Sequence, residues 1–176
     1  MKRTLGLTLL LFATLFSCMR QEKPLPAELS RAESVMWEHP DSALSILRSM
    51  PQSSLSSGKN YATWALLLAQ ARDKVYGKRL PDSLNIPSSD KLVQDAMDYF
   101  EKEGNLKRMA QTYYYKGQLL KDQKKITEAM PFFLKSKEMM TTLDEPLFTY
   151  LICQSLGNTY RYQDRYEESL VQLKDA

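Results

Sequence analysis

The segment AQTYYYKGQLLKDQKKITEAMPFFLKS, residues 110–136, is matched in pattern by YLICQSLGNTYRYQDRYEESLVQLKDA, residues 150–176. Gly117 in the first segment aligns with Gly157 in the second at an offset of 40 residues, and the other matches keep the same offset. A constant internal period of this size is typical of arrays of helix pairs. We therefore expect each segment to form one helix–turn–helix unit.

The aligned glycines need a physical explanation, because glycine inside a helix costs about 1 kcal/mol relative to alanine. The close approach of a second helix offsets that cost, and such a crossing needs a small residue and a large one on the facing helix. Both segments supply them, twelve and sixteen residues after the glycine. The residues expected to pack the repeats are Gly117, Ala129, Phe133, Gly157, Ser169 and Leu173.

These positions resemble the tetratricopeptide repeat, which has a small residue in its first helix, and an alanine-like residue followed by a large apolar residue in its second. The resemblance implies a right-handed α-solenoid of helix–turn–helix repeats. The chain departs from the family in its 40-residue spacing, against about 34 in the family. Pro131 is a second departure, and we expect it to kink its helix.

Two earlier units are more degenerate. Ala96 and Phe100 lie 33 residues before Ala129 and Phe133, so a third pair follows the same pattern. Alternating strand patterns are absent, whereas Ala, Leu, Met, Lys, Glu and Gln are abundant, which favours an all-α fold. An unrelated helical bundle is the alternative. We expect about four helix pairs, at residues 28–50, 59–103, 106–140 and 147–176, with a long loop over 77–90.

The first eighteen residues have the layout of a secretory targeting signal. Lys2 and Arg3 precede the apolar run 5–16, and small Ser17 precedes Cys18. The run is too short to span a bilayer as a helix, which takes about 20 residues, and it fits a secretory signal. The cysteine after the small residue resembles a bacterial lipoprotein signal, with Cys18 as the lipidated residue. A plain cleaved signal and an uncleaved signal anchor are the alternatives.

This interpretation divides the chain into a lipoprotein signal peptide at 1–17, a tether at 18–27 and a tetratricopeptide-like domain at 28–176. It implies a lipid-anchored protein of the Gram-negative cell envelope, on the periplasmic side or at the cell surface. Loss of Lys2 and Arg3 with the signal reduces the 24 basic residues to 22, against 21 acidic ones. A chain so close to neutral gives no electrostatic reason to expect nucleic-acid binding.

We expect no catalytic activity, cofactor or metal. His39, the single histidine, precedes a proline in a helix–helix turn. The chain has no Cys/His cluster with metal-binding spacing and no glycine-rich phosphate loop. If Cys18 is lipidated, Cys153 has no disulfide partner and is expected to pack as a small apolar residue. Trp37 and Trp64 are expected in the core.

Binding of a protein or peptide is the function that the resemblance implies, because first helices line a concave groove in tetratricopeptide arrays. We expect Tyr113 in the core and Tyr114 and Tyr115 at its edges, with Tyr114 as the groove candidate. A sensory or regulatory head of a longer protein and a small-ligand or glycan-binding accessory lipoprotein are the alternatives. The candidate groove residues are Gln111, Tyr114, Gln118, Lys121, Gln154, Asn158 and Arg161.

The last unit has no capping helix in this sequence, which ends at Ala176. Terminal repeats of solenoids need a polar outer face, because each repeat buries apolar surface on its neighbour. We therefore expect Leu170 and Leu173 to be partly exposed or to meet another chain, and a homodimer through the C-terminal helix pair is one hypothesis. A shortened form of a longer repeat protein is another.

Overall fold

The computed structural model describes residues 24–76 and 89–176, and this part of the chain is all-helical, without β-strands. The all-α prediction is therefore confirmed. The signal peptide, Cys18 and most of the expected loop lie outside the described residues. The elements are α2 (Ala27–Val35), α3 (Pro40–Ser49), the 3-10 helix η2 (Gln52–Leu55), α4 (Gly58–Tyr76), α5 (Ser89–Glu103), α6 (Leu106–Asp122), α7 (Ile126–Met140), α8 (Pro146–Arg161) and α9 (Tyr166–Lys174).

The turns that close α6 and α8 have the same backbone geometry. Lys124 and Asp164, one repeat period apart, have φ angles of 63° and 57°. The residue after each of them donates a backbone hydrogen bond five residues back, at 2.9 Å from Lys125 and 3.0 Å from Arg165. This is the bonding pattern of a helix ending in a left-handed residue. The 40-residue sequence period thus corresponds to a period in backbone structure.

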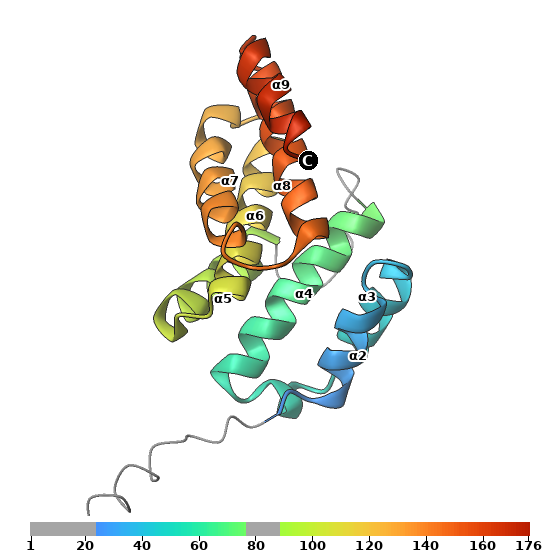
Figure 1. Ribbon diagram of the computed structural model, residues 1–176. Helices are drawn as coiled ribbons and strands as arrows, with labels where there is room; N and C mark the ends of the chain where they lie inside the picture. The colour runs from blue at the N-terminus through green and yellow to red at the C-terminus, as the bar shows by residue number, and fades with distance from the viewer. Residues whose placement is uncertain (1–23, 77–88) are drawn as a thin grey trace, which may run out of the picture.

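The helices pack in a regular order along the chain (Figure 1). Every α-helix contacts the next one in sequence. The first helices of the pairs also contact each other, α2 with α4, α4 with α6 and α6 with α8. The second helices α3, α5, α7 and α9 make no contacts with one another in the described part of the chain. One face of the molecule is therefore formed by first helices only.

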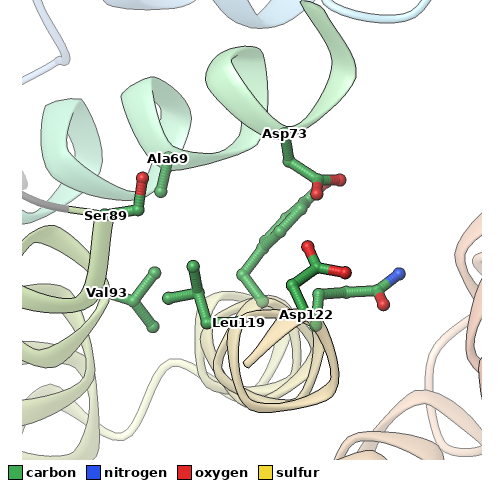
Figure 2. Close-up of a pocket in the computed structure, with 8 residues that line it drawn as sticks. Ala69, Asp73, Ser89, Val93, Leu119 and Asp122 are labelled. Atoms are coloured by element: carbon green, nitrogen blue, oxygen red, sulfur yellow. The ribbon is translucent and has the colours of Figure 1, made fainter. Parts of the chain in front are cut away.

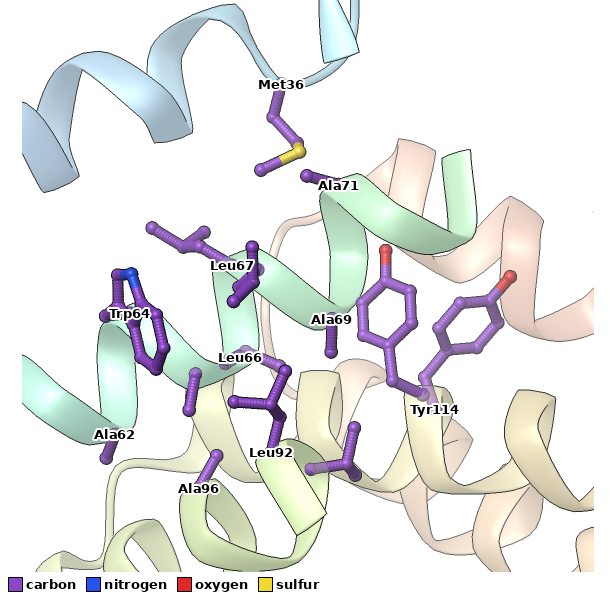
Figure 3. Close-up of a cluster of buried hydrophobic side chains, with 14 of the residues drawn as sticks. Met36, Ala62, Trp64, Leu66, Leu67, Ala69, Ala71, Leu92, Ala96 and Tyr114 are labelled. Atoms are coloured by element: carbon purple, nitrogen blue, oxygen red, sulfur yellow. The ribbon is translucent and has the colours of Figure 1, made fainter. Parts of the chain in front are cut away.

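The core is centred on α4, which crosses the middle of the molecule (Figure 1) and carries several of the buried side chains drawn in Figure 3. Every residue of α4 from 62 to 72 is buried, because α2 and α3 cover one side of the helix and α5 and α6 the other. Leu66 and Leu68 have no exposed surface. The indole Nε1 of Trp64 donates to the Leu47 carbonyl at 2.9 Å, which joins α4 to α3.

Trp37 departs from the sequence prediction, whereas Trp64 agrees with it. Trp64 is 8% exposed, but Trp37 is 38% exposed. Trp37 follows the end of α2, and its ring lies on the surface between two other helices. The Lys74 ammonium is 3.4 Å from the ring centroid, and Phe148 of α8 meets the ring edge-on with centroids 6.3 Å apart. The prediction that Trp37 is a core residue is therefore wrong.

The three consecutive tyrosines are all buried, so the expectation that two of them lie at the edges of the core is also wrong. Tyr113, Tyr114 and Tyr115 are 6%, 4% and 3% exposed. The reason is that α6 is covered on several sides, by α5, α7, α4 and α8. Tyr113 stacks at a tilt with Phe132 of α7, and the other two rings meet Phe148 of α8 edge-on.

The second helix of this unit, α7, continues through Pro131 as one helix of 15 residues. Pro131 lies near its N-terminal end and is exposed. Proline has no backbone N–H, so the carbonyl four residues before it loses its helical hydrogen bond. Because this part of the helix is exposed, water can bond to that carbonyl instead.

Candidate functional site

The close helix crossings lie at the aligned glycines. A Cβ atom built on Gly117 would stand 2.6 Å from Cε1 of Phe133, and one on Gly157 would stand 2.8 Å from Cγ of Leu173. The Ser169 hydroxyl donates to the Gly157 carbonyl at 2.8 Å. Ala129 has no exposed surface. These contacts fix the angle between the two helices of each pair, and so the orientation of the first helices.

A polar network joins α6 to α8 on the face formed by the first helices. Gln118 Nε2 donates to the Tyr114 hydroxyl at 2.5 Å and to the Ser155 hydroxyl at 3.2 Å. Lys121 Nζ in turn donates to Gln118 Oε1. Three candidate groove residues therefore bond to one another. Ser155 was not predicted as a groove residue, because its repeat equivalent is Tyr115 and no sequence pattern distinguishes it.

Two of the candidate groove residues do not form an open surface, which corrects the prediction. Gln111 is 7% exposed and Tyr114 is 4% exposed. Gln111 accepts a hydrogen bond from Arg108 at 3.1 Å, and Arg108 also pairs with Glu33 at 2.8 Å. Burial raises the pKa of Tyr114. α4 and α8 pack against α6 on the side where these side chains lie.

The remaining candidates are accessible to different degrees. Gln154 and Arg161 are exposed, while Asn158 is partly buried between them along α8. Gln154 Nε2 donates to the Tyr150 hydroxyl at 3.1 Å. The accessible part of the predicted groove is therefore on α8, and the part on α6 is occupied by the polar network.

A small cavity lies between α4, α5 and α6. It has a volume of about 30 Å³, which is room for one or two water-sized groups. In Figure 2 the carboxylates of Asp73 on α4 and Asp122 on α6 extend into the space between their helices. The other lining residues are Ala69, Ser89, Val93, Tyr115, Gln118 and Leu119.

The cavity is an unfavourable place for negative charge. Burial raises the pKa of Asp73, and the nearby Asp122 carboxylate raises it further. Lys121 and Lys74 act in the opposite direction without reversing the shift. Burial also raises the pKa of Tyr115 well above its ordinary value, with a smaller contribution from Asp73. Tyr115 is therefore a neutral hydroxyl at physiological pH.

This pair of carboxylates could not be predicted from the sequence. Asp73 and Asp122 lie 49 residues apart, each beside a lysine near the end of a helix. Acidic and basic neighbours at a helix end usually indicate a solvated surface. Only the packing of α4 against α6 brings the two side chains to one cavity.

Among the described residues, no group of three or more His, Cys, Asp and Glu side chains could hold a metal ion. None of the described helices is long and apolar enough to cross a membrane. His39 is exposed at the start of α3. Cys153 is buried and in no disulfide within the described residues, and burial raises the pKa of its thiol although a hydrogen bond with Lys137 acts in the opposite direction.

Large apolar side chains are exposed on the C-terminal pair. Leu170 and Val171 are each 54% exposed, and Leu173 is 47% exposed although it packs on Gly157. Tyr162 and Tyr166 are each 61% exposed. The partial exposure that the sequence predicts for Leu170 and Leu173 is present.

Comparison with known proteins gives no match for this chain among protein-family models, curated proteins or solved structures.

Proposed function

We propose that this chain is a tetratricopeptide-like module, a right-handed array of helix pairs that binds a protein or peptide on the face formed by its first helices. The observation that carries the proposal is the alternating packing. First helices contact first helices, each second helix contacts the next first helix, and second helices do not meet in the described part of the chain. Stacked repeats of one kind pack in this way. The equivalent glycine crossings and turns support the same proposal.

The binding surface that we propose is the accessible side of α8. Gln154, Asn158 and Arg161 lie there at spacings of three and four residues, which places them on one face of the helix. Amide and guanidinium groups donate hydrogen bonds to peptide carbonyls and to carboxylates. We therefore propose a partner with an extended segment that carries acidic groups near this end of the array.

We also propose that the module is tethered to a membrane of the cell envelope through a lipid on Cys18. The support is the sequence of the first eighteen residues, followed by a short polar stretch with two prolines at 24 and 26. Metabolic labelling with a palmitate analogue tests the tether. We expect label on the wild-type chain and none on Cys18→Ser, and equal label on both would refute it.

Site-specific cross-linking tests the binding surface. A photoreactive residue at position 162, which is exposed beside Arg161, is expected to capture a partner. Adding the double change Gln154→Ala and Arg161→Ala to this chain should reduce the recovery of the partner at least fivefold. Glu138→Ala, an exposed change on the second helix α7, serves as the matched control and should leave recovery unchanged. Equal recovery with the α8 variant and with the control would reject the proposed surface.

Glycan binding is less well supported, because it relies on exposed aromatic faces. Trp37 is the exposed tryptophan of the described chain, but Lys74 lies over its ring and Phe148 packs against it. The tryptophan therefore offers little free surface for a sugar ring.

A further inference from the structure

We propose that α9 pairs with α9 of a second copy of this chain, antiparallel and related to it by a two-fold axis. The surface that forms the pair, which we call the α9 face, consists of Glu167, Leu170, Val171 and Lys174. All four side chains are exposed. Their spacing of three, four and seven residues places them in one stripe along the helix.

The α9 face points away from the rest of the protein. Ser169 lies on the inner side of α9, where its hydroxyl donates to the Gly157 carbonyl of α8 at 2.8 Å. Glu167 and Val171 are each two residues from Ser169, and a turn of about 200° places them on the outer side. Among the described helices, α8 alone packs its backbone against α9, at the outer end of the array (Figure 1). The described part of the chain therefore leaves the α9 face uncovered.

The centre of the α9 face is apolar. Leu170 and Val171 are each 54% exposed. Burial of apolar surface is the main favourable contribution to most protein association. In the antiparallel pair, Leu170 of one copy lies opposite Val171 of the second copy, and the two-fold axis repeats the contact. The two exposed side chains thus cover each other.

The charges at the two ends of the α9 face complement a copy of the same helix. Glu167 lies one turn before the apolar centre and Lys174 one turn after it. Two antiparallel helices that cross between residues 170 and 171 bring Glu167 of each copy opposite Lys174 of the other. A parallel pair would instead bring like charges together at both ends, which is unfavourable. The charge pattern therefore selects the antiparallel, two-fold arrangement.

Glu167 and Lys174 are available for these contacts. Neither side chain makes an ion pair or a hydrogen bond with another described residue. Glu168, by contrast, pairs with Arg165 at 2.8 Å, so its charge is already matched within the chain. Glu167 and Lys174 are also two turns apart, about 10 Å along the helix axis, which separates them from each other. A second copy would match both charges at once.

The α9 face is not a general property of the second helices, which align at Ala43, Ala96, Ala129 and Ser169. On α7, Thr127 and Leu134 replace the two end charges. On α5, Asp98 replaces the valine. On α3, the equivalent leucine, Leu44, is 5% exposed, and a serine replaces the valine. Within the described part of the chain, α9 alone combines an exposed apolar centre with opposite charges at its ends.

The pair is expected to be weak, because α9 has only nine residues. Small interfaces are typical of transient complexes, so we expect self-association that depends on protein concentration. The lipid tether proposed above would confine both copies to one membrane. Confinement raises the effective concentration of one copy around the other and favours the pair.

Charge reversal tests the proposal, by sedimentation of the full chain in a mild detergent over a range of concentrations. Glu167→Lys and Lys174→Glu each replace two attractive contacts with two repulsive ones, and each should weaken self-association at least fivefold. An equimolar mixture of the two variants restores opposite charges at both ends and should recover the wild-type association. The double variant should do the same. Glu138→Lys, an exposed charge reversal on α7, is the matched control and should have no effect.

Salt gives a second readout. Because salt screens exposed charges, added sodium chloride should weaken the wild-type pair and strengthen the association of each single variant. Every variant has the same N-terminal segment, so association through that segment would not distinguish them. Circular dichroism of each variant verifies that the reversed charge leaves the helices folded.

Three results would overturn the proposal. A wild-type chain that stays monomeric at every concentration would assign the α9 face to a different protein. Self-association that both single changes leave intact would place the contact elsewhere on the chain. Folded single variants that dissociate but do not recover when mixed would exclude the antiparallel pair. The α9 face contains no residue of α8, so none of these results decides the proposed binding surface.

Discussion

Phe133 places its ring where the first side-chain atom of residue 117 would stand if that residue were not glycine. Cε1, Cδ1 and Cζ of the ring lie 2.6, 2.8 and 3.0 Å from that position. Phe133 has no exposed surface, and its ring also packs against Tyr114 with centroids 5.9 Å apart. The ring therefore has little room to move, and a glycine is required at this crossing.

Gly117→Ala is predicted to destabilise the fold by about 1 kcal/mol. Alanine improves helix propensity by about 1 kcal/mol, but forcing a methyl group into a packed core costs about 1–3 kcal/mol. The measurement is urea unfolding followed by circular dichroism. A gain in stability equal to the full propensity difference would show that the crossing is open.

Gly157→Ala is the internal comparison, because the second repeat has Leu173 in place of the phenylalanine. Leu173 is 47% exposed and can turn toward solvent, although the Ser169 carbonyl oxygen, 3.3 Å away, stays fixed. We expect Gly157→Ala to cost less than Gly117→Ala. Adding Phe133→Leu to Gly117→Ala should show a coupling of at least about 0.5 kcal/mol.

Ser169→Ala is predicted to cost about 1 kcal/mol, because it leaves the Gly157 carbonyl without the hydroxyl that donates to it at 2.8 Å in a buried setting. Ser136→Ala removes a similar bond to the Ala110 carbonyl, 2.7 Å long and also buried, and should cost about as much. The exposed change Ser45→Ala is the control. Unfolding midpoints that match across all three variants would show that neither bond contributes to stability.

The ionisation of Tyr113 is expected to lower the free energy of unfolding in strong alkali. Burial, and a 2.6 Å hydrogen bond from its hydroxyl to Glu101, raise its pKa to about 12. In the unfolded chain the pKa is about 10. The stabilisation is present below pH 10 and is lost as the pH rises through 12, because the unfolded state releases its proton first.

The measurement is the ultraviolet titration difference between the wild-type chain and Tyr113→Phe, which isolates this phenol among the ten tyrosines. Glu101→Gln should lower the pKa of Tyr113 toward its ordinary value. Tyr150→Phe, on the exposed side of α8, is the matched control. A Tyr113 that titrates near pH 10 in the wild-type chain would contradict the prediction.

The repeat pattern was enough to predict helices and their crossings. The expected helix from Lys59 to Tyr76 is α4, Gly58–Tyr76, and the aligned glycines lie at close contacts. These features are local, because helix periodicity and the need for a small residue depend on neighbours within one pair. The same reasoning places Ala96 and Phe100 in the core.

Contacts between different pairs could not be predicted in the same way. Tyr114 matches the pattern of a groove residue within its own unit, yet Phe148 from the next unit covers it. The sequence pattern placed Trp37 on an apolar helix face, but α2 ends at Val35 and Trp37 is 38% exposed. The pairing of Asp73 with Asp122 depends on how two units stack. Sequence periodicity within a unit contains no information about that stacking angle.

The buried carboxylate gives the last prediction. Burial and Asp122 raise the pKa of Asp73 above its unfolded value, with Lys121 and Lys74 opposing. A raised carboxyl pKa stabilises the fold only while the group is protonated, so its contribution is complete below a pH of about 4 and is lost as the pH rises through the folded-state pKa. Asp73→Asn should therefore raise the urea midpoint at pH 7, with a difference that shrinks toward pH 4. Asp144→Asn, whose carboxylate is exposed, should show no such pH-dependent difference. If Asp73→Asn instead lowered the midpoint at pH 7, the Asp73 carboxylate would have to be stabilised by a cation within the chain, contrary to the direction in which burial and Asp122 shift its pKa.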